Sequence, residues 1–248
     1  VDVLIEEREP GAAHDAGKRE RRGDPSANAL AAARRRLPCT RTANAMPFIN
    51  GIGPGELLVL QPTRVIPRKG IEHAIEFTRR LGRPARLVIS HASGDEGPEY
   101  EQRLREYAGL LGVDVRFESE IIGDRHGQTA DGRQVHTLAD VYPAADFVTY
   151  PSAFEGFGNA FLEAVYYRRP ILVNNYSTYE VDIRPRGFRV VWLDGFIRDE
   201  ALGQARRLLD DPAEADAWAD RNYALAARHF SFTVLGRHLE DLLLDCFG

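Results

Sequence analysis

The 248-residue sequence has little cysteine and no long hydrophobic run. Its two cysteines, Cys39 and Cys246, are too few for a disulfide framework and suit a reducing compartment. No apolar run approaches the roughly 18 residues that a transmembrane helix needs. The apolar stretch from Val1 to Ile5 is too short for the core of a signal peptide. We therefore expect a cytoplasmic protein without a transmembrane segment.

The sequence also lacks a surplus of positive charge. The formal net charge is −5, and no long basic face with interleaved aromatic residues is present. We therefore expect no nucleic-acid partner for the folded part of the chain. The chain does not begin with methionine, and its one methionine is Met46. We interpret the missing initiator as a sign that the sequence is a fragment.

Several familiar motifs are absent. There is no G-x-x-x-x-G-K-S/T phosphate loop and no G-x-S-x-G nucleophile elbow. The glycine-rich stretch Gly51–Gly55 precedes an expected strand instead of following it. His14, His126 and His136 show no metal-ligand spacing with each other or with cysteine, and no strand ends in D-x-D. We expect no required metal and no other cofactor.

The first 55 residues differ in composition from the rest. Residues 6–47 contain arginine, alanine, glycine and proline but almost no valine, isoleucine, phenylalanine or tyrosine. Such a segment cannot supply a packed face, so we expect a largely disordered leader over 1–55 and a folded domain over 56–248. Ser26 to Arg36 is rich in alanine and favours a short helix. A nucleic-acid-binding arm is the alternative for its arginine clusters.

From Glu56 onward, short apolar runs alternate with amphipathic stretches. Strands are expected at 57–60, 86–90, 113–118, 147–150, 171–173 and 189–193. Helices are expected at 71–81, 99–111, 137–142, after Gly158, and at 197–209, 212–229 and 232–245. The polar segment 121–135 is expected to be a loop or an excursion from this alternating pattern. Strands that alternate with helices predict a doubly wound α/β domain, whose parallel sheet is covered on both faces.

The segment from Asp146 to Asn174 reads as strand, glycine-rich loop, helix and strand. Gly156 and Gly158 let the backbone approach a bound group closely, and the unpaired amides at the helix start favour an anion. Within the helix, Asn159 and Glu163 share a face at i,i+4 spacing. A glycine-rich turn of this kind is common, so by itself it indicates nucleotide binding only weakly.

A basic loop follows the first expected strand. It runs from Gln61 to Gly70, and Arg64, Arg68 and Lys69 in it could address one anion together with the amides of the next helix. Ligands of such sheets bind beyond the carboxyl ends of the strands, where this loop lies. A solvated basic loop is the alternative.

The two segments together resemble a known family. The pattern P-S-x-x-E-G-F-G-x-x-x-x-E-A, with two glutamates eight positions apart, is spelled by Pro151, Ser152, Glu155, Gly156, Phe157, Gly158, Glu163 and Ala164. It resembles the E-x7-E element of retaining glycosyltransferases with the GT-B architecture, in particular the group 1 (GT4) family. That family carries an arginine and a lysine, five apart, which hold the donor's diphosphate. Arg64 and Lys69 match that spacing. The resemblance covers about Leu57 to Phe247 and omits the leader.

The resemblance implies a Rossmann-like fold, the C-terminal half of GT-B, that binds a nucleotide sugar as donor. It places Glu155 at the donor sugar as the catalytic candidate and Glu163 on the ribose hydroxyls. Backbone amides of Phe157, Gly158 and Asn159 would contact the sugar or phosphate. Three alternatives stay open: surface glutamates spaced eight apart by chance, Phe157 as a core anchor, and Asn159 as a helix cap.

Two further positions stay open. After the strand at 171–173 the family commonly has a Gly-Gly turn and then a glutamate, whereas this chain has no glycine between Asn174 and Glu180. Glu180 matches the acid, but the missing glycines put the sugar contacts of that loop in doubt. His91 follows a strand at a place where nucleotide contacts occur, and a bystander role is favoured there.

The resemblance therefore implies a donor-binding domain that takes part in hexose transfer from a nucleoside diphosphate sugar to an unknown acceptor. The resemblance implies a missing N-terminal domain that carries the acceptor, so we expect no activity from the chain alone. A non-catalytic nucleotide-sugar-binding module is one alternative. A GT-B relative such as a nucleotide-sugar epimerase or a phosphorylase is the other.

Overall fold

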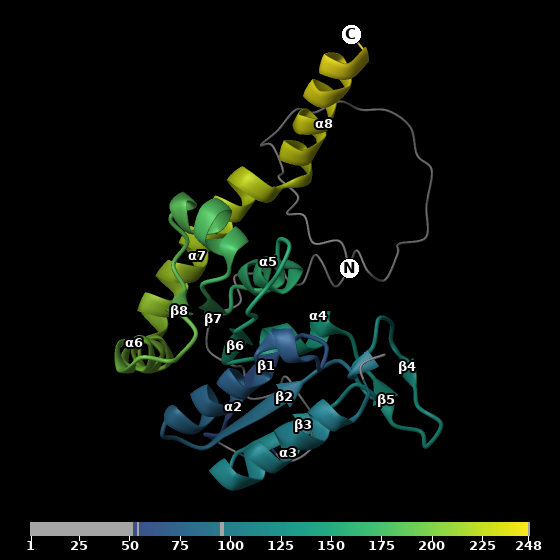
Figure 1. Ribbon diagram of the computed structural model, residues 1–248, viewed down its shortest axis with the longest axis vertical. Coiled ribbons are helices and arrows are strands. Elements are labelled where there is room, and N and C mark those ends of the chain that lie inside the picture. The colour runs from purple at the N-terminus through teal and green to yellow at the C-terminus, as the bar shows by residue number, and fades with distance from the viewer. Residues whose placement is uncertain (1–51, 54, 95–96, 248) are drawn as a thin grey trace, which may run out of the picture.

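The protein is built on a six-stranded parallel sheet (Figure 1). The computed structural model describes residues 52–53, 55–94 and 97–247. The strand order across the sheet is β3-β2-β1-β6-β7-β8, and every neighbouring pair is parallel. The six strands are β1 (Leu57–Gln61), β2 (Ala85–Ile89), β3 (Asp114–Phe117), β6 (Phe147–Tyr150), β7 (Ile171–Asn174) and β8 (Val191–Leu193). All six expected strands are present, and their ends differ from the expected ones by at most two residues.

Helices connect the strands in the expected alternation. The α-helices are α2 (Ile71–Arg80), α3 (Glu99–Leu111), α4 (Leu138–Val141), α5 (Asn159–Tyr166), α6 (Asp199–Asp210), α7 (Pro212–Phe230) and α8 (Phe232–Phe247). Short turns of other helix types are η1 (Pro67–Lys69), η3 (Tyr142–Ala144), η4 (Tyr179–Ile183) and η5 (Arg184–Arg186). None of the described helices is both long enough and apolar enough to span a membrane.

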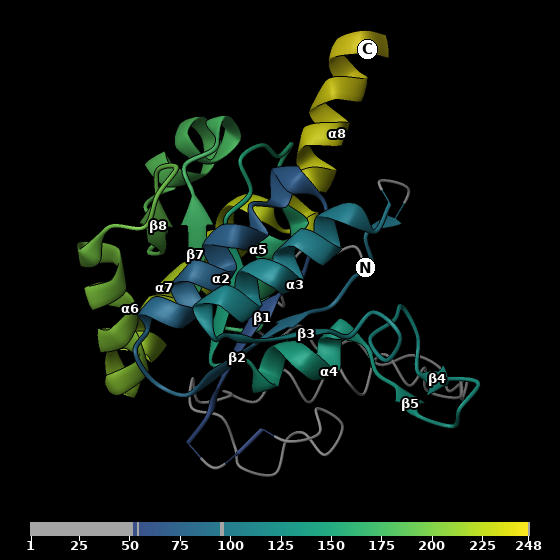
Figure 2. The ribbon, with the colours of Figure 1, turned by 60° about the horizontal axis from the view of Figure 1, so that its bottom comes forward.

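The side chains of successive residues in a strand point to opposite faces of the sheet, so they pack into two different hydrophobic clusters. Leu58 and Leu60 of β1 pack with α5 and the later part of α7, whereas Val59 packs with α2, α3 and α6. Figure 2 shows α2 and α3 side by side over β1 and β2. Both faces of the sheet are thus covered by helices. The predicted doubly wound fold is confirmed.

The chain reverses its direction across the sheet between β1 and β6. It first runs outward from β1 through β2 to β3, and then returns to place β6 against β1, with Val59 paired to Phe147 and Leu60 to Val148. Loops after adjacent strands at such a switch point diverge to opposite faces and leave room for a ligand. The loops after β1 and β6 are the basic loop and the glycine-rich loop.

The segment expected to be a loop at 121–135 contains a small hairpin. Its strands are β4 (Gly127–Gln128) and β5 (Gln134–Val135), paired antiparallel. The turn is closed by Thr129, whose amide donates to the carbonyl of Arg133 at 2.9 Å, and by Gly132, whose φ is 83°. The hairpin extends beyond the β3 side of the sheet (Figure 2). The loop expectation was therefore wrong in part.

The last helix, α8, stands away from the sheet (Figure 1). None of its described residues is buried, and large apolar side chains along it are exposed, including Leu239, Leu242 and Phe247. Apart from residues 52, 53 and 55, the expected leader lies outside the described residues, and so does the expected helix at Ser26–Arg36.

Candidate functional site

The basic loop after β1 docks tightly against the start of the glycine-rich loop. Pro67 begins the turn η1, and Gly70 ends it with a φ of 60°. A Cβ added to Gly70 would lie 2.5 Å from the carbonyl oxygen of Pro151, closer than any real contact. The amide of Ala153 also donates to the carbonyl of Arg68 at 2.8 Å. Glycine is therefore required at position 70 for the two loops to meet.

Lys69 and Glu155 form an ion pair between these two loops. The Lys69 ammonium donates to Glu155 Oε1, and both residues are buried, with 8% and 9% of their surface exposed. Arg68 reaches the same oxygen at 3.2 Å from its Nη1 and donates to the carbonyl of Phe154 at 3.1 Å. Two cations thus share one carboxylate oxygen.

The charges of this cluster shift its ionisation. Burial by itself raises the pKa of Glu155, but hydrogen bonding from Lys69 and the nearby positive charges outweigh it and hold that pKa below its ordinary value. Burial lowers the pKa of Lys69, and Glu155 offsets part of that effect. The cluster keeps more positive than negative charge, because Arg64 adds to the field around Lys69.

Arg64 and His91 lie beside this cluster. The Arg64 side chain is exposed, and no carboxylate among the described residues pairs with it. The loops that carry the two residues are joined by a hydrogen bond of 3.2 Å from the Val65 amide to the carbonyl of Ala92. Burial lowers the pKa of His91, Asp124 raises it, and Arg64 and Lys69 lower it. His91 therefore lies within the field of the predicted diphosphate ligands.

The glycine-rich loop turns sharply into α5 at Gly158, which has a φ of 100° and serves as the N-cap. A Cβ added here would lie 2.8 Å from the Tyr176 hydroxyl oxygen and 3.0 Å from two atoms of Tyr150. The backbone therefore passes directly over these two rings. The amide of Phe161 donates to the Gly158 carbonyl at 3.0 Å, whereas the amides of Asn159 and Ala160 before it have no backbone partner within α5. Unpaired amides at a helix start favour an anion.

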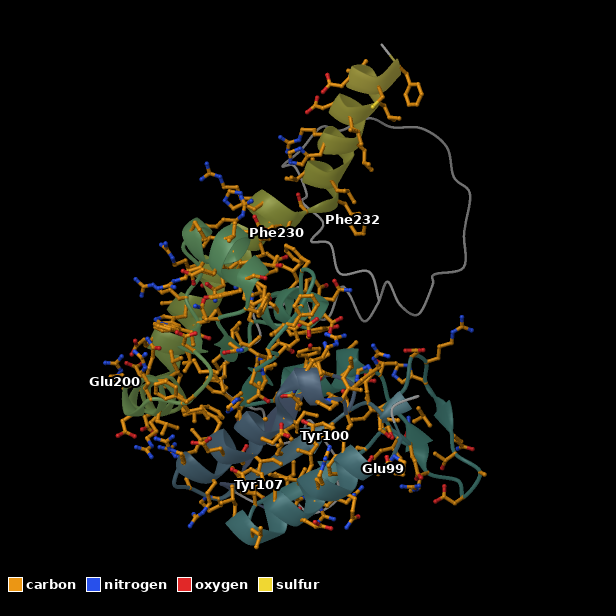
Figure 3. All side chains as sticks on the ribbon, viewed as in Figure 1. Glu99, Tyr100, Tyr107, Glu200, Phe230 and Phe232 are labelled. Carbon is orange, nitrogen blue, oxygen red and sulfur yellow. The ribbon has the colours of Figure 1, made fainter. Side chains whose placement is uncertain are left out.

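The structure separates the alternatives for two neighbouring residues. The Phe157 ring packs edge-on against Phe230, with centroids 4.9 Å apart, and the Phe157 carbonyl accepts a hydrogen bond of 3.0 Å from Tyr176. Figure 3 labels Phe230 at the end of α7. The Phe157 side chain is thus an anchor. Asn159 is exposed and is the first residue of α5, so the suggestion that it caps the helix is wrong.

Glu163 lies in the second turn of α5 and is half-buried. Its Oε2 accepts a hydrogen bond of 2.8 Å from the hydroxyl of Tyr142. Burial raises the pKa of Glu163, and this hydrogen bond opposes the rise. Glu163 is therefore a constrained side chain and does not behave as an ordinary surface glutamate.

The loop after β7 supports the glycine-rich loop through residues that the sequence analysis did not select. The Asn174 amide group donates to the carbonyl of Ser152 at 3.0 Å, and Thr178 donates to the carbonyl of Glu155 at 3.3 Å. Glu180 instead points to the surface and pairs with Arg184 at 2.6 Å. The asparagine at the end of a buried strand was the one signal in the sequence that could have indicated this support.

No group of three or more His, Cys, Asp or Glu side chains that could hold a metal ion occurs within residues 52–53, 55–94 and 97–247. The sequence-predicted site residues lie together at the carboxyl edge of the sheet: Arg64, Lys69, Glu155, Phe157, Gly158 and Asn159. Glu163 lies one turn further along α5. The cluster carries more positive than negative charge, with one carboxylate in it.

Comparison with known proteins places the chain in a family. Residues 43–224 match the family described as glycosyl transferases group 1. The chain is 30% identical over 221 residues to mannosylglucosylglycerate synthase of Thermotoga maritima, a match that covers 77% of this chain and 49% of that protein. It is 34% identical over 161 residues to the protein of the same name in Petrotoga mobilis, covering 57% of this chain and 36% of that one. The chain thus spans about half the length of these relatives or less.

Solved structures show the same fold. Anabaena HepE in complex with UDP-glucose superposes with a TM-score of 0.63 at 17% identity, covering 90% of this chain and 54% of that one. The C-terminal domain of a group 1 family protein, LpcC of Francisella tularensis, superposes with a TM-score of 0.57 at 17% identity, covering 79% of this chain and 97% of that domain. The fold is that of the C-terminal domain of a GT-B glycosyltransferase. The chain belongs to the group 1 glycosyltransferase family.

Proposed function

We propose that this chain binds a nucleoside diphosphate sugar and forms the donor half of a retaining hexosyltransferase. The observation that carries the proposal is the cluster of Arg64, Arg68 and Lys69 around Glu155 at the switch point of the sheet. This edge offers more positive than negative charge, next to the free amides at the start of α5. A diphosphate with a sugar attached fits that distribution of charge.

Arg64 and Lys69 would hold the diphosphate. A departing diphosphate gathers negative charge in the transition state, and fixed cations lower the barrier most where that charge develops. The backbone amides of Phe157, Gly158 and Asn159 would add donors on the opposite side. Because these groups already balance the diphosphate, the proposal requires no metal ion and no other cofactor.

The two glutamates would act at different parts of the donor. Glu155, held beside Lys69, is the carboxylate next to the expected sugar and the one candidate for catalysis. The neighbouring cations keep it ionised, so it can stabilise positive charge at the sugar carbon. Glu163, one turn further along α5, would accept hydrogen bonds from the ribose hydroxyls. Retention of the sugar's configuration is part of the proposal and rests on the resemblance of the E-x7-E pattern.

The comparisons support a hexose donor. One relative is named mannosylglucosylglycerate synthase, and one structural neighbour was solved with UDP-glucose. A thermal-shift panel with UDP, GDP and ADP sugars tests this point. Stabilisation by at least one of them, and by the matching nucleoside diphosphate, is expected. A flat response to every member would contradict donor binding.

The acceptor and the other half of the active site are part of the proposal as well. The chain spans about half of its relatives, so an N-terminal domain that binds the acceptor is the proposed partner. Placing two substrates together lowers a barrier by roughly 7 to 11 kcal/mol. We therefore expect residues 1–248 to bind the donor without transferring the sugar at an enzymatic rate, and we place the protein in the cytoplasm.

Transfer assays separate this proposal from a non-catalytic binding module. Residues 1–248 alone should show donor binding by calorimetry and no more than slow donor hydrolysis. The same chain joined to an acceptor domain should transfer the sugar, whereas a binding module would stay inactive. Rapid transfer by residues 1–248 alone would contradict the division of labour proposed here.

A further inference from the structure

Glu163 is a half-buried carboxylate on α5. No lysine or arginine forms an ion pair with it in the described part of the chain, and burial raises its pKa. A carboxylate in such a place tends to protonate unless hydrogen bonds favour its charged form. Among the described residues, the one side chain that donates to Glu163 is Tyr142. The state of Glu163 therefore depends on that tyrosine.

The Tyr142 side chain is held by burial, by ring stacking and by its hydrogen bond. It is fully buried, and its ring stacks on that of Tyr167 with centroids 5.0 Å apart and planes 10° apart. It begins the turn η3, which follows α4 directly and contains Pro143. The hydroxyl lies 2.8 Å from Glu163 Oε2 and 3.4 Å from the carbonyl of Ala160. Because a hydroxyl has one proton, the shorter contact receives it.

The contact leaves most of the carboxylate available. An ionised carboxylate has about four sites that accept hydrogen bonds, and Tyr142 occupies one of them. The remaining sites can accept from two hydroxyls on adjacent carbons. A phenylalanine at position 142 would fill the same space and stack on Tyr167 equally well. The hydroxyl therefore serves Glu163 and is not needed for packing.

We propose that Tyr142 is a positioning residue for donor recognition: its hydroxyl orients the Glu163 carboxylate and keeps it charged, so that Glu163 can accept hydrogen bonds from the two ribose hydroxyls. This rests on the proposed function, which places the ribose at Glu163. Two side chains together would thus select a ribose. Tyr142 comes from η3, just before β6, and Glu163 comes from α5, just after β6.

A pair of ligands that differ only at the ribose tests the inference. Calorimetry on residues 1–248 would compare UDP with 2′,3′-dideoxy-UDP, and likewise GDP and ADP with their dideoxy forms if UDP does not bind. The wild-type chain should bind the ribonucleotide on the order of tenfold tighter or more, because two hydrogen bonds to a charged group are lost in the dideoxy form. Tyr142→Phe should weaken the ribonucleotide about tenfold and leave the dideoxy form unchanged.

Tyr167→Phe is the matched control. It removes a hydroxyl from the partner ring of the same stack, and no hydrogen bond from that hydroxyl to Glu163 is present in the described residues. Both ligands should bind it as they bind the wild type. Thermal unfolding of each variant checks that the fold is retained.

The pH dependence of nucleotide binding is a second test, because a purely structural role of the Tyr142 hydroxyl would not change it. The Tyr142 hydrogen bond lowers the pKa of Glu163, so its removal raises that pKa further. As the pH falls, Tyr142→Phe should lose its preference for the ribonucleotide at a higher pH than the wild type does. If Tyr142→Phe does not fold, carbon NMR of Glu163 in the wild type carries the test, with its resonance assigned by Glu163→Gln. An ionised Glu163 at pH 7 is expected, and a protonated one would overturn the inference.

The outcomes separate the two layers of the proposal. Equal binding of ribonucleotide and dideoxy form by the wild type would overturn the ribose assignment of Glu163 and with it this part of the proposed function. A wild-type preference that Tyr142→Phe retains in full would overturn the inference alone. Equal weakening of both ligands by Tyr142→Phe would assign the hydroxyl a structural role and would also overturn it.

Discussion

Lys69 and Glu155 pair at the point where the loops after β1 and β6 meet. The lysine comes from the first half of the sheet and the glutamate from the second, so the pair spans the switch point. A diphosphate that binds Lys69 must compete with Glu155 for the same ammonium group. Donor binding and the position of the candidate catalytic carboxylate are therefore linked through one side chain.

Lys69→Ala should weaken binding of a nucleoside diphosphate by about 1.5 to 3 kcal/mol, the range for a hydrogen bond to a charged group. Calorimetry measures the change. Arg83→Ala is a suitable control, because Arg83 forms an exposed ion pair of 2.9 Å with Asp210 at the other end of β2. If Lys69→Ala binds the nucleoside diphosphate as tightly as the wild type does, Lys69 is not a diphosphate ligand.

Substitutions of Glu155 and Glu163 should affect different steps, sugar transfer and nucleotide binding respectively. Glu155→Gln should abolish sugar transfer in a chain joined to an acceptor domain while nucleotide binding survives, because the amide cannot supply negative charge beside the sugar. Glu163→Ala should mainly weaken nucleotide affinity, by about 1.5 to 3 kcal/mol. Steady-state kinetics with donor titration measures both. The reverse pattern would exchange the two roles.

Much of this site was predictable because its residues lie in local patterns. The strand Phe147–Tyr150 is a short β-branched and aromatic run ended by Pro151, and the structure has it at those bounds. Arg64 and Lys69 follow a strand by a few residues, which places them at the carboxyl edge of any parallel sheet. For such residues sequence order already determines position.

Other features depend on contacts that no local pattern reveals. The Tyr142 and Glu163 pair joins residues 21 positions apart through the packing of η3 on α5. The π-helical turn Tyr179–Ile183 lies in a stretch that reads as loop, and its Tyr179 ring packs against that of Phe161. The β4–β5 hairpin was missed although Asp131-Gly132 is a recognised turn signal, because its strands have two residues each.

The two glutamates should also have opposite effects on the pH dependence of stability. The pKa of Glu155 is held below its ordinary value of 4.5. Its pairing therefore stabilises the fold above pH 4.5, and that stabilisation is lost as the pH falls through the lower folded pKa. The pKa of Glu163 is raised above its ordinary value of 4.5, so its contribution to stability is present below pH 4.5 and is lost as the pH rises from there through the folded pKa.

Denaturant unfolding at several pH values tests these signs. The stability of the wild type relative to Glu155→Gln should increase as the pH rises from about 3 to 5, the interval around the ordinary pKa of a glutamate. The stability of the wild type relative to Glu163→Gln should decrease as the pH rises above the ordinary glutamate pKa of 4.5. Slopes of the same sign for both variants would contradict the environments described for these side chains.

Gly158, like Gly70, should not tolerate a side chain without a large cost. Its φ of 100° lies in the region that favours glycine, and an added Cβ would lie 2.8 Å from the Tyr176 hydroxyl oxygen. Gly158→Ala should therefore destabilise the fold by about 2 to 4 kcal/mol through backbone strain and overpacking, and should weaken nucleotide binding because the α5 amides move. Denaturant unfolding and calorimetry measure the two effects.

Gly109→Ala is the control for Gly158→Ala, because Gly109 lies within α3 with no atom within 4 Å of its added Cβ. Alanine at position 109 should be neutral or stabilising. Tyr176→Phe in the Gly158→Ala background should recover part of the loss, since it removes the closest atom but not the strain. A Gly158→Ala variant as stable as Gly109→Ala would contradict the close approach of this loop to the two tyrosines.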